Sequence, residues 1–94
     1  MKNYFDYYTT ACETMNEIEN KLWKDYSDMS PFMEFDDIKA FMYKMDIDPA
    51  IIFKYHNAYA NKTLIREYAL KNDNDLYHRI EQYEVMGNEL FNLN

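Results

Sequence analysis

The chain has 94 residues, 48% of them hydrophobic, with a formal charge of −7, one Cys, one Gly and two Pro. A chain of this length forms one domain, and its apolar content excludes global disorder. Because Gly and Pro are too scarce for the many turns of a β-rich fold, we predict a single helical domain over residues 1–94. We expect an all-α, compact bundle of four or five helices with a long N-terminal helix.

The negative charge is concentrated in the first half of the chain. Residues up to Asp48 include eleven acidic and five basic side chains, whereas those from Pro49 onward include six and five. Nucleic acids and anionic membranes recruit Lys and Arg, so this balance disfavours direct binding of either. A basic protein is the partner that such a surface favours.

The first predicted element is a helix from about Tyr4 to Tyr26, with Asn3 as its N-cap. Its apolar residues recur at steps of three and four, which places them on one stripe. They are Tyr4, Tyr8, Ala11, Cys12, Met15, Ile18, Leu22, Trp23 and Tyr26. Cys12 is alone in the chain, so it forms no intrachain disulfide, and its place on the stripe predicts a small buried hydrophobic residue. The acidic residues Asp6, Glu13, Glu17, Asp25 and Asp28 lie off the stripe, and Tyr7 lies beside them.

A second helix is expected after a polar break. Ser30 and Pro31 offer one helix start, Asp36 offers another, and Asp37 adds to the acidic residues there. The spacing of Ile38, Phe41, Met42 and Met45 then predicts an amphipathic helix. Phe32, Met33 and Phe35 form a dense apolar corner just before it.

A third helical region starts where Asp48 can act as N-cap and Pro49 as first helical residue. Its expected apolar face comprises Ile52, Phe53, His56, Tyr59 and Ala60, followed by Ile65, Tyr68 and Ala69. Asn61–Thr63 is a possible break, so the pattern leaves open whether residues 49–72 form one bent helix or two.

The last helix is predicted from about Asp75 to Met86, after a linker over residues 72–75. Leu76, Ile80 and Tyr83 are its inward residues. Gly87 follows where a helix C-terminus favours a left-handed residue. Beyond it, Leu90, Phe91 and Leu93 form a short apolar tail that we expect to fold back on the bundle.

No motif in the chain carries recognisable chemistry. Asp46 and Asp48 suggest calcium, but an EF-hand loop needs a central Gly and a distal Glu, which are missing here. His78 and Glu81 share a helix face without further Glu-x-x-His partners, and we interpret His56 as a core or boundary residue. We therefore predict no enzyme activity, no metal site and no cofactor.

Surface character provides the remaining functional signal. Ten Tyr exceed what a small bundle can bury with every hydroxyl satisfied, so several are expected at the surface, where Tyr favours protein interfaces. Glu13 and Glu17 are one helical turn apart, and their ~6 Å spacing along the axis is comparable to that of neighbouring phosphates in a nucleic-acid strand. A solvated helix face has the same pattern.

The segment Tyr83-Glu84-Val85-Met86-Gly87-Asn88-Glu89-Leu90 resembles a stretch near the C-terminus of the ArdA antirestriction family, which reads roughly Tyr-Glu-Ala-Tyr-Gly-Arg-Asp-Leu. Tyr83, Glu84, Gly87 and Leu90 match. The resemblance implies a small acidic protein from a phage or mobile element that imitates DNA and occupies a host defence nuclease. In its general character the chain is also similar to anti-CRISPR proteins.

We therefore expect a non-enzymatic inhibitor that binds a basic host protein, such as a CRISPR effector or a restriction nuclease. The predicted partner-binding residues are Asp6, Tyr7, Glu13, Glu17, Asp25, Asp28, Asp36 and Asp37. With no basic region followed by an apolar core at the start, the expected location is the cytoplasm, that of the host cell if the protein is phage-encoded. The alternative is a self-associating helical regulatory or structural module, such as a homodimer. A helix-turn-helix DNA binder over Ile38–Tyr59 is disfavoured by the charge.

Overall fold

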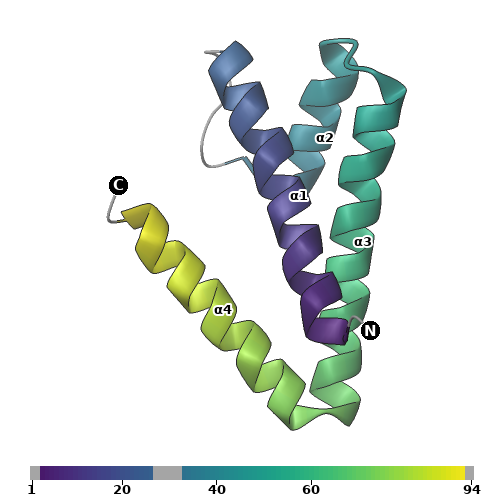
Figure 1. The fold of residues 1–94 in the computed structure, drawn as a ribbon. Helices are drawn as coiled ribbons and strands as arrows, with labels where there is room; N and C mark the ends of the chain where they lie inside the picture. The colour runs from purple at the N-terminus through teal and green to yellow at the C-terminus, as the bar shows by residue number, and fades with distance from the viewer. Residues whose placement is uncertain (1–2, 27–32, 93–94) are drawn as a thin grey trace.

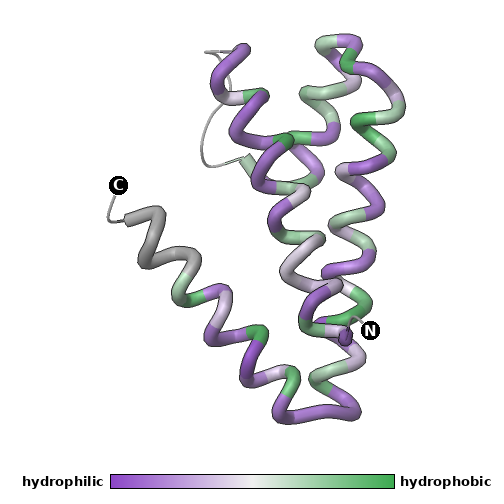
Figure 2. Tube along the Cα trace, viewed as in Figure 1, coloured by the Kyte–Doolittle hydropathy of each residue, from purple (hydrophilic) through white to green (hydrophobic). Residues whose placement is uncertain are grey.

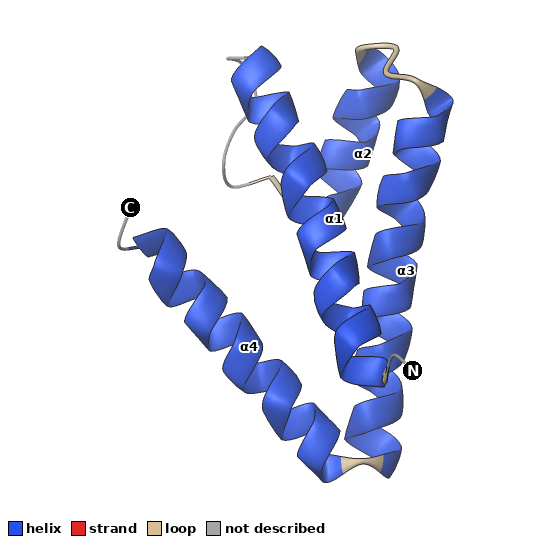
Figure 3. Cartoon of the chain, viewed as in Figure 1, coloured by secondary structure: helices blue, strands red, loops and turns tan. Residues whose placement is uncertain are grey.

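The computed structural model describes residues 3–26 and 33–92, and the side chains of residues 3–26 and 33–86. This part of the chain forms four helices, α1 (Tyr4–Asp25), α2 (Phe35–Lys44), α3 (Pro49–Asn72) and α4 (Asn74–Asn92), with no strand among the described residues (Figures 1 and 3). The predicted all-α fold with a long N-terminal helix is confirmed. Among the described residues, no helix is long and apolar enough to cross a membrane.

Two predicted helix starts are confirmed by their hydrogen bonds. The backbone N–H of Asp6 donates to the Asn3 side chain at 2.9 Å, which caps α1. The N–H of Ala50 donates to the Asp48 carboxylate at 2.9 Å, and Pro49 occupies the first turn of α3. Each cap satisfies an N–H that has no partner within its own helix.

The start of α2 lies one residue before the position predicted for it. The helix begins at Phe35 rather than Asp36, because Glu34 and Asp37 cap it reciprocally. The other predicted start, at Ser30 and Pro31, lies outside the described residues, as does Phe32.

The end of α2 is a Schellman turn with an unusual residue in it. The N–H of Ile47 donates to Met42 O at 3.0 Å, and that of Asp46 to Tyr43 O at 3.2 Å, which is the hydrogen-bond pattern of this motif. Asp46 has φ of 56°, in the left-handed region that Gly occupies most readily. Ile47 packs against the same core as Met42. Met45, predicted on the buried face, is 38% exposed because it ends the helix at this turn.

Residues 49–72 form one continuous helix, so the open question about a break is resolved. The predicted apolar face of α3 is wrong in part, because Phe53, His56, Tyr59 and Tyr68 are exposed. The buried residues are Ile52, Tyr55, Ala58 and Ala69. Hydrophobic and hydrophilic residues alternate along the whole of α3 (Figure 2), and its apolar residues include both buried and exposed ones, so their periodicity does not select the face that its neighbours cover.

The region predicted as a linker after α3 is almost entirely helical. Only Asp73 separates α3 from α4. Its N–H donates to Ala69 O at 2.9 Å, closing α3, while its carboxylate accepts the N–H of Leu76 at 3.1 Å, capping α4. One residue thus satisfies both helix ends and makes a tight turn between the two helices.

The predicted helix end at Gly87 is also wrong. Helix α4 continues through Gly87 to Asn92, and Gly87 has no positive φ. A Gly inside a helix costs only about 1 kcal/mol relative to Ala, and no Pro follows to end the helix. The tail residues Leu90 and Phe91 are therefore part of α4 rather than a segment that folds back, and Leu93 lies outside the described residues.

Two core clusters are built on the pair α1 and α3. The first joins α2 to both helices through Met15, Leu22, Ile38, Met42 and Tyr55, among others. The second joins α4 to both through Tyr8, Cys12, Ala69, Leu76 and Ile80. Helices α2 and α4 therefore cover different halves of the α1–α3 pair. Figure 1 shows α4 diverging from α1 toward its C-terminal end.

Of the nine residues predicted on the stripe of the first helix, five are buried, Ile18, Trp23 and Tyr26 are partly buried, and Tyr4 is exposed. Tyr8, Ala11, Cys12, Met15 and Leu22 are buried. Tyr4 is 53% exposed because it lies in the first turn, where its ring packs against Tyr68 with centroids 5.1 Å apart.

Candidate functional site

The predicted partner-binding residues are exposed wherever the structure describes them. They are Asp6, Tyr7, Glu13, Glu17, Asp25, Asp36 and Asp37, while Asp28 lies outside the described residues. They do not form one surface: α1 places some on its solvent side and others along a groove beside α3, with Glu17 shared by these two locations, and α2 places the rest at its N-terminus.

The first location is the solvent side of α1, which carries Asp6, Glu13 and Glu17. At 100° per residue these three lie opposite the buried Tyr8 and Met15. We call them the acidic ridge. Among the described side chains, none of the three takes part in a salt bridge; the ion pairs found join Arg66 to glutamates of α4. The negative charge of the ridge is therefore not neutralised by direct ion pairing within the described part of the protein.

The second location is the N-terminus of α2, where Asp36 and Asp37 lie in the first turn. Asp37 accepts the backbone N–H of Glu34 at 3.3 Å. Carboxylates in this position stabilise a helix through its dipole and its unpaired N–H groups. This local role explains both residues without a partner.

The third location is a groove between α1 and α3, which Tyr7, Glu17 and Asp25 help to line. It consists of two adjoining hollows of about 660 and 470 Å³, and Lys54 lines both. We call this the α1–α3 groove. Its described walls come from α1, from α3 and from the Met45–Asp48 connection, so neither α2 nor α4 covers it.

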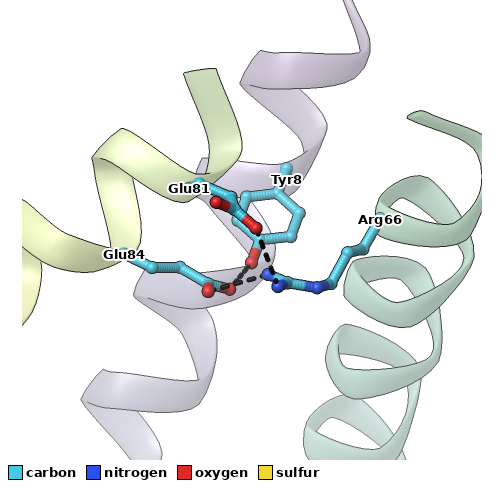
Figure 4. Close-up of polar contacts among 4 residues, drawn as sticks. All are labelled: Tyr8, Arg66, Glu81 and Glu84. Atoms are coloured by element: carbon cyan, nitrogen blue, oxygen red, sulfur yellow. Dashed lines mark hydrogen bonds and ion pairs between the residues drawn. The ribbon is translucent and has the colours of Figure 1, made fainter. Parts of the chain in front are cut away.

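A polar cluster that the sequence pattern did not predict links three helices (Figure 4). The hydroxyl of the completely buried Tyr8 donates to the Glu84 carboxylate. Arg66 donates to the other oxygen of Glu84 at 2.7 Å and approaches Glu81 at 3.7 Å. The available signal was Tyr8 itself, because a Tyr on a buried stripe needs a partner for its hydroxyl.

The cluster determines the charge state of its members. Burial disfavours the charged form of Glu84, but the Tyr8 hydroxyl and the Arg66 guanidinium outweigh it and hold the pKa of Glu84 below its usual value. Burial, reinforced by Glu84, raises the pKa of Tyr8, so Tyr8 remains a neutral donor. Burial likewise raises the pKa of Cys12, which keeps its thiol protonated and consistent with the predicted core role.

In a second Tyr–carboxylate pair, burial outweighs the hydrogen bond, and the pKa of the acid is raised. The Tyr55 hydroxyl donates to Glu19 at 3.3 Å. Burial raises the pKa of Glu19 despite this hydrogen bond and the nearby Lys62. Each of the two buried tyrosines, Tyr8 and Tyr55, thus donates its hydroxyl to a carboxylate on another helix, and both pairs join elements distant in the sequence.

The candidates for other chemistry are dispersed. His56 is exposed rather than at the core or its boundary, with Nδ1 3.1 Å from the Lys39 Nζ. His78 lies 3.5 Å from Gln82 on the exposed side of α4. Over the described residues, no group of three or more His, Cys, Asp or Glu side chains is placed to hold a metal ion.

Comparison of the chain with protein-family models, with curated proteins and with solved structures found no match.

Proposed function

We propose that this protein is a non-enzymatic inhibitor that binds a basic, nucleic-acid-handling protein and occupies the surface on which that protein holds DNA or RNA. A host defence nuclease, such as a restriction enzyme or a CRISPR effector, is the class of partner that fits the proposal. The observation that carries it is the acidic ridge, whose three carboxylates are exposed and have no ion-pair partner within the described part of the protein.

The arrangement of the ridge supports a partner with several cationic side chains. Glu13 and Glu17 are one turn apart on a rigid helix, at ~6 Å along its axis. A partner that normally binds phosphates offers Lys and Arg at such intervals. These side chains can bind the carboxylates of the ridge in place of the phosphates without a large conformational change. The exposed ring of Tyr7 lines the neighbouring α1–α3 groove and provides apolar contact area, which Tyr commonly does in interfaces.

The test is an inhibition assay on Glu13→Lys/Glu17→Lys, beside thermal melting followed by circular dichroism. We expect inhibition to be abolished, since like charges facing a basic site cost several kcal/mol. The fold should survive because both positions are exposed, where substitutions usually change stability by less than about 0.5 kcal/mol. The control is Glu67→Lys, which makes the same kind of charge change at an exposed position of α3, and this variant should inhibit normally. Full inhibition by the double variant would refute the role of the ridge.

Self-association is the second candidate, and it too has an observation in its favour. Phe53, Leu64, Val85 and Met86 are each more than half exposed. Exposed apolar residues mark an interface where they form a contiguous patch. Sedimentation or light scattering distinguishes the two candidates: a concentration-dependent dimer supports self-association, whereas a monomer at all concentrations removes it.

A further inference from the structure

The α1–α3 groove has the dimensions of a helix-binding site. Its α1 wall is lined from Tyr4 to Asp25, roughly 30 Å at ~1.5 Å per residue. The buried Ala11 and Ala58 face it from the two helices. Small side chains at these two positions leave room between the helices that larger ones would fill.

One end of the groove is acidic over an apolar floor. Glu17, Asp25, Asp46 and Asp48 line it against only two lysines, and the hydrophobic residues Ile18, Leu22 and Ile51 lie between them. Helices α1 and α2 end here and add partial negative charge, whereas α3 begins here at Pro49 and its N-terminus adds partial positive charge, so the acidity of this end comes from its carboxylates. This combination suits a cation on a long alkyl chain, as in Arg or Lys.

The other end is aromatic and nearly uncharged. Tyr4, Tyr7 and Phe53 line it with 53%, 51% and 65% of their areas exposed, and Lys54 is the one charged residue among its described lining. Thr10, Thr14, Asn57 and Asn61 complete the rim with neutral polar groups. Aromatic rings around a hollow favour an apolar anchor from a partner.

We propose that the α1–α3 groove binds an amphipathic basic helix of the partner protein, with its cationic end between Glu17, Asp25 and Asp46 and its apolar end among Tyr4, Tyr7 and Phe53. This inference rests on the proposed function in assuming a protein partner, and it goes further by giving that partner a secondary structure and a direction. The charge difference between the two ends is what sets the direction.

A helix fits better than the other occupants. Helices α1 and α3 run in opposite directions (Figure 1), and a third helix lying along both completes the packing of a bundle and places anchors at i, i+4 and i+7. A nucleic acid would bring phosphates to four carboxylates, which is unfavourable. A small ligand would fill only part of a groove about 30 Å long.

The experiment uses a fluorescein-labelled peptide of about 20 residues, long enough to span the groove as a helix. Its first half carries leucines at i, i+4 and i+7, and its second half carries three arginines. A second peptide replaces the arginines with glutamine. Binding is measured by fluorescence anisotropy on the full chain, and contacts are mapped by ¹⁵N amide shifts.

Three variants locate the binding site. Glu17→Lys should lower the affinity for the arginine peptide by about tenfold, because it reverses a charge at the acidic end of the groove. Thr14→Trp should lower the affinity for both peptides, because it fills the groove without changing its charge. Glu67→Lys carries the same charge change as Glu17→Lys at an exposed position of α3 outside the groove, and should bind within twofold of the original protein. Circular dichroism confirms that each variant is folded.

The inference is supported if peptide binding changes amide chemical shifts along the sides of α1 and α3 that line the groove, and if the three variants change peptide affinity as stated. It is overturned by equal loss in Glu17→Lys and Glu67→Lys, by shifts confined to α4, or by no saturable binding up to about 1 mM peptide. A homodimer that Thr14→Trp dissociates would assign the groove to a second copy and overturn it as well. If Thr14→Trp still inhibits the partner but Glu13→Lys does not, the groove proposal fails while the proposed function stands. If the protein binds the arginine peptide in its groove but inhibits no partner, the proposed function fails while the groove proposal stands.

Discussion

Replacing Tyr8 with Phe isolates the hydrogen bond that joins the first helix to the last. Tyr8 is completely buried, and its hydroxyl donates to Glu84, which is 76 residues away in the sequence. The ring and its packing are kept in Phe, so only the hydroxyl is lost. We expect the free energy of unfolding to fall at pH 7 while the helical content stays the same.

The magnitude follows from the surroundings of the pair. A hydrogen bond to a charged group contributes about 1.5–3 kcal/mol. The Glu84 side chain is 33% exposed, so water competes for it, and the lower part of that range, about 1.5 kcal/mol, applies. Glu84→Ala should cost more, about 2–3 kcal/mol, because it leaves the Tyr8 hydroxyl buried without an acceptor and removes a partner of Arg66.

The assay is urea denaturation of both single variants and of the double variant. In the absence of Glu84, replacing Tyr8 with Phe should cost close to nothing, since the hydroxyl no longer has its acceptor. Tyr7→Phe is the matched control: its ring is 51% exposed, so we expect a change below about 0.5 kcal/mol. Equal stability of Tyr8→Phe and Tyr7→Phe, or stability losses of Tyr8→Phe and Glu84→Ala that simply add in the double variant, would contradict this role of the hydrogen bond.

The same pair predicts a dependence on pH. Because the pKa of Glu84 is lowered in the folded state from its ordinary value of 4.5, its ionisation stabilises the protein above that value, and the stabilisation is lost as the pH falls through the lowered pKa. The stability difference between the original protein and Tyr8→Phe should therefore shrink in acid. A difference that stays constant from pH 7 to pH 3 would contradict this assignment.

Three further variants test other parts of the fold by denaturation. Asp46→Gly should stabilise the protein by about 0.5–1 kcal/mol, because Gly accommodates the positive φ at the end of α2; a loss of stability would contradict the Schellman turn. Glu19→Gln should stabilise at pH 7 and have no effect below pH 4.5, because burial raises the pKa of Glu19 and its ionisation opposes folding. Asp48→Ala should cost about 1 kcal/mol through loss of the α3 cap, with Asp36→Ala as a weaker comparison.

Local chemistry explains the parts of the fold that the sequence predicted well. Asn3 and Asp48 cap helices through N–H groups two or three residues away, so their roles are encoded within a few residues. The buried stripe of α1 could likewise be predicted from the sequence, because that helix has one covered side and one solvated side. The acidic ridge was predicted for the same reason.

Tertiary contacts explain what the sequence did not predict. Helix α3 is covered by α2 along one half and by α4 along the other, so no single apolar stripe marks its buried side, and Phe53 was assigned to the core although it is 65% exposed. The partner of Tyr8 lies on α4, and nothing in the local sequence identifies Glu84 as its acceptor. The groove depends on Ala11 facing Ala58 across two helices, a pairing that appears only once the helices are packed.

In the proposed function, the protein occupies a nucleic-acid-binding surface of its partner through its acidic first helix. The most direct test is competition: a host protein captured with this chain is loaded with labelled DNA or RNA, and the chain is titrated in. We predict that the original protein displaces the nucleic acid, less effectively as salt rises, and that Glu13→Lys/Glu17→Lys does not displace it. A stable ternary complex that retains the nucleic acid, or equal displacement by the double variant, would contradict the claim.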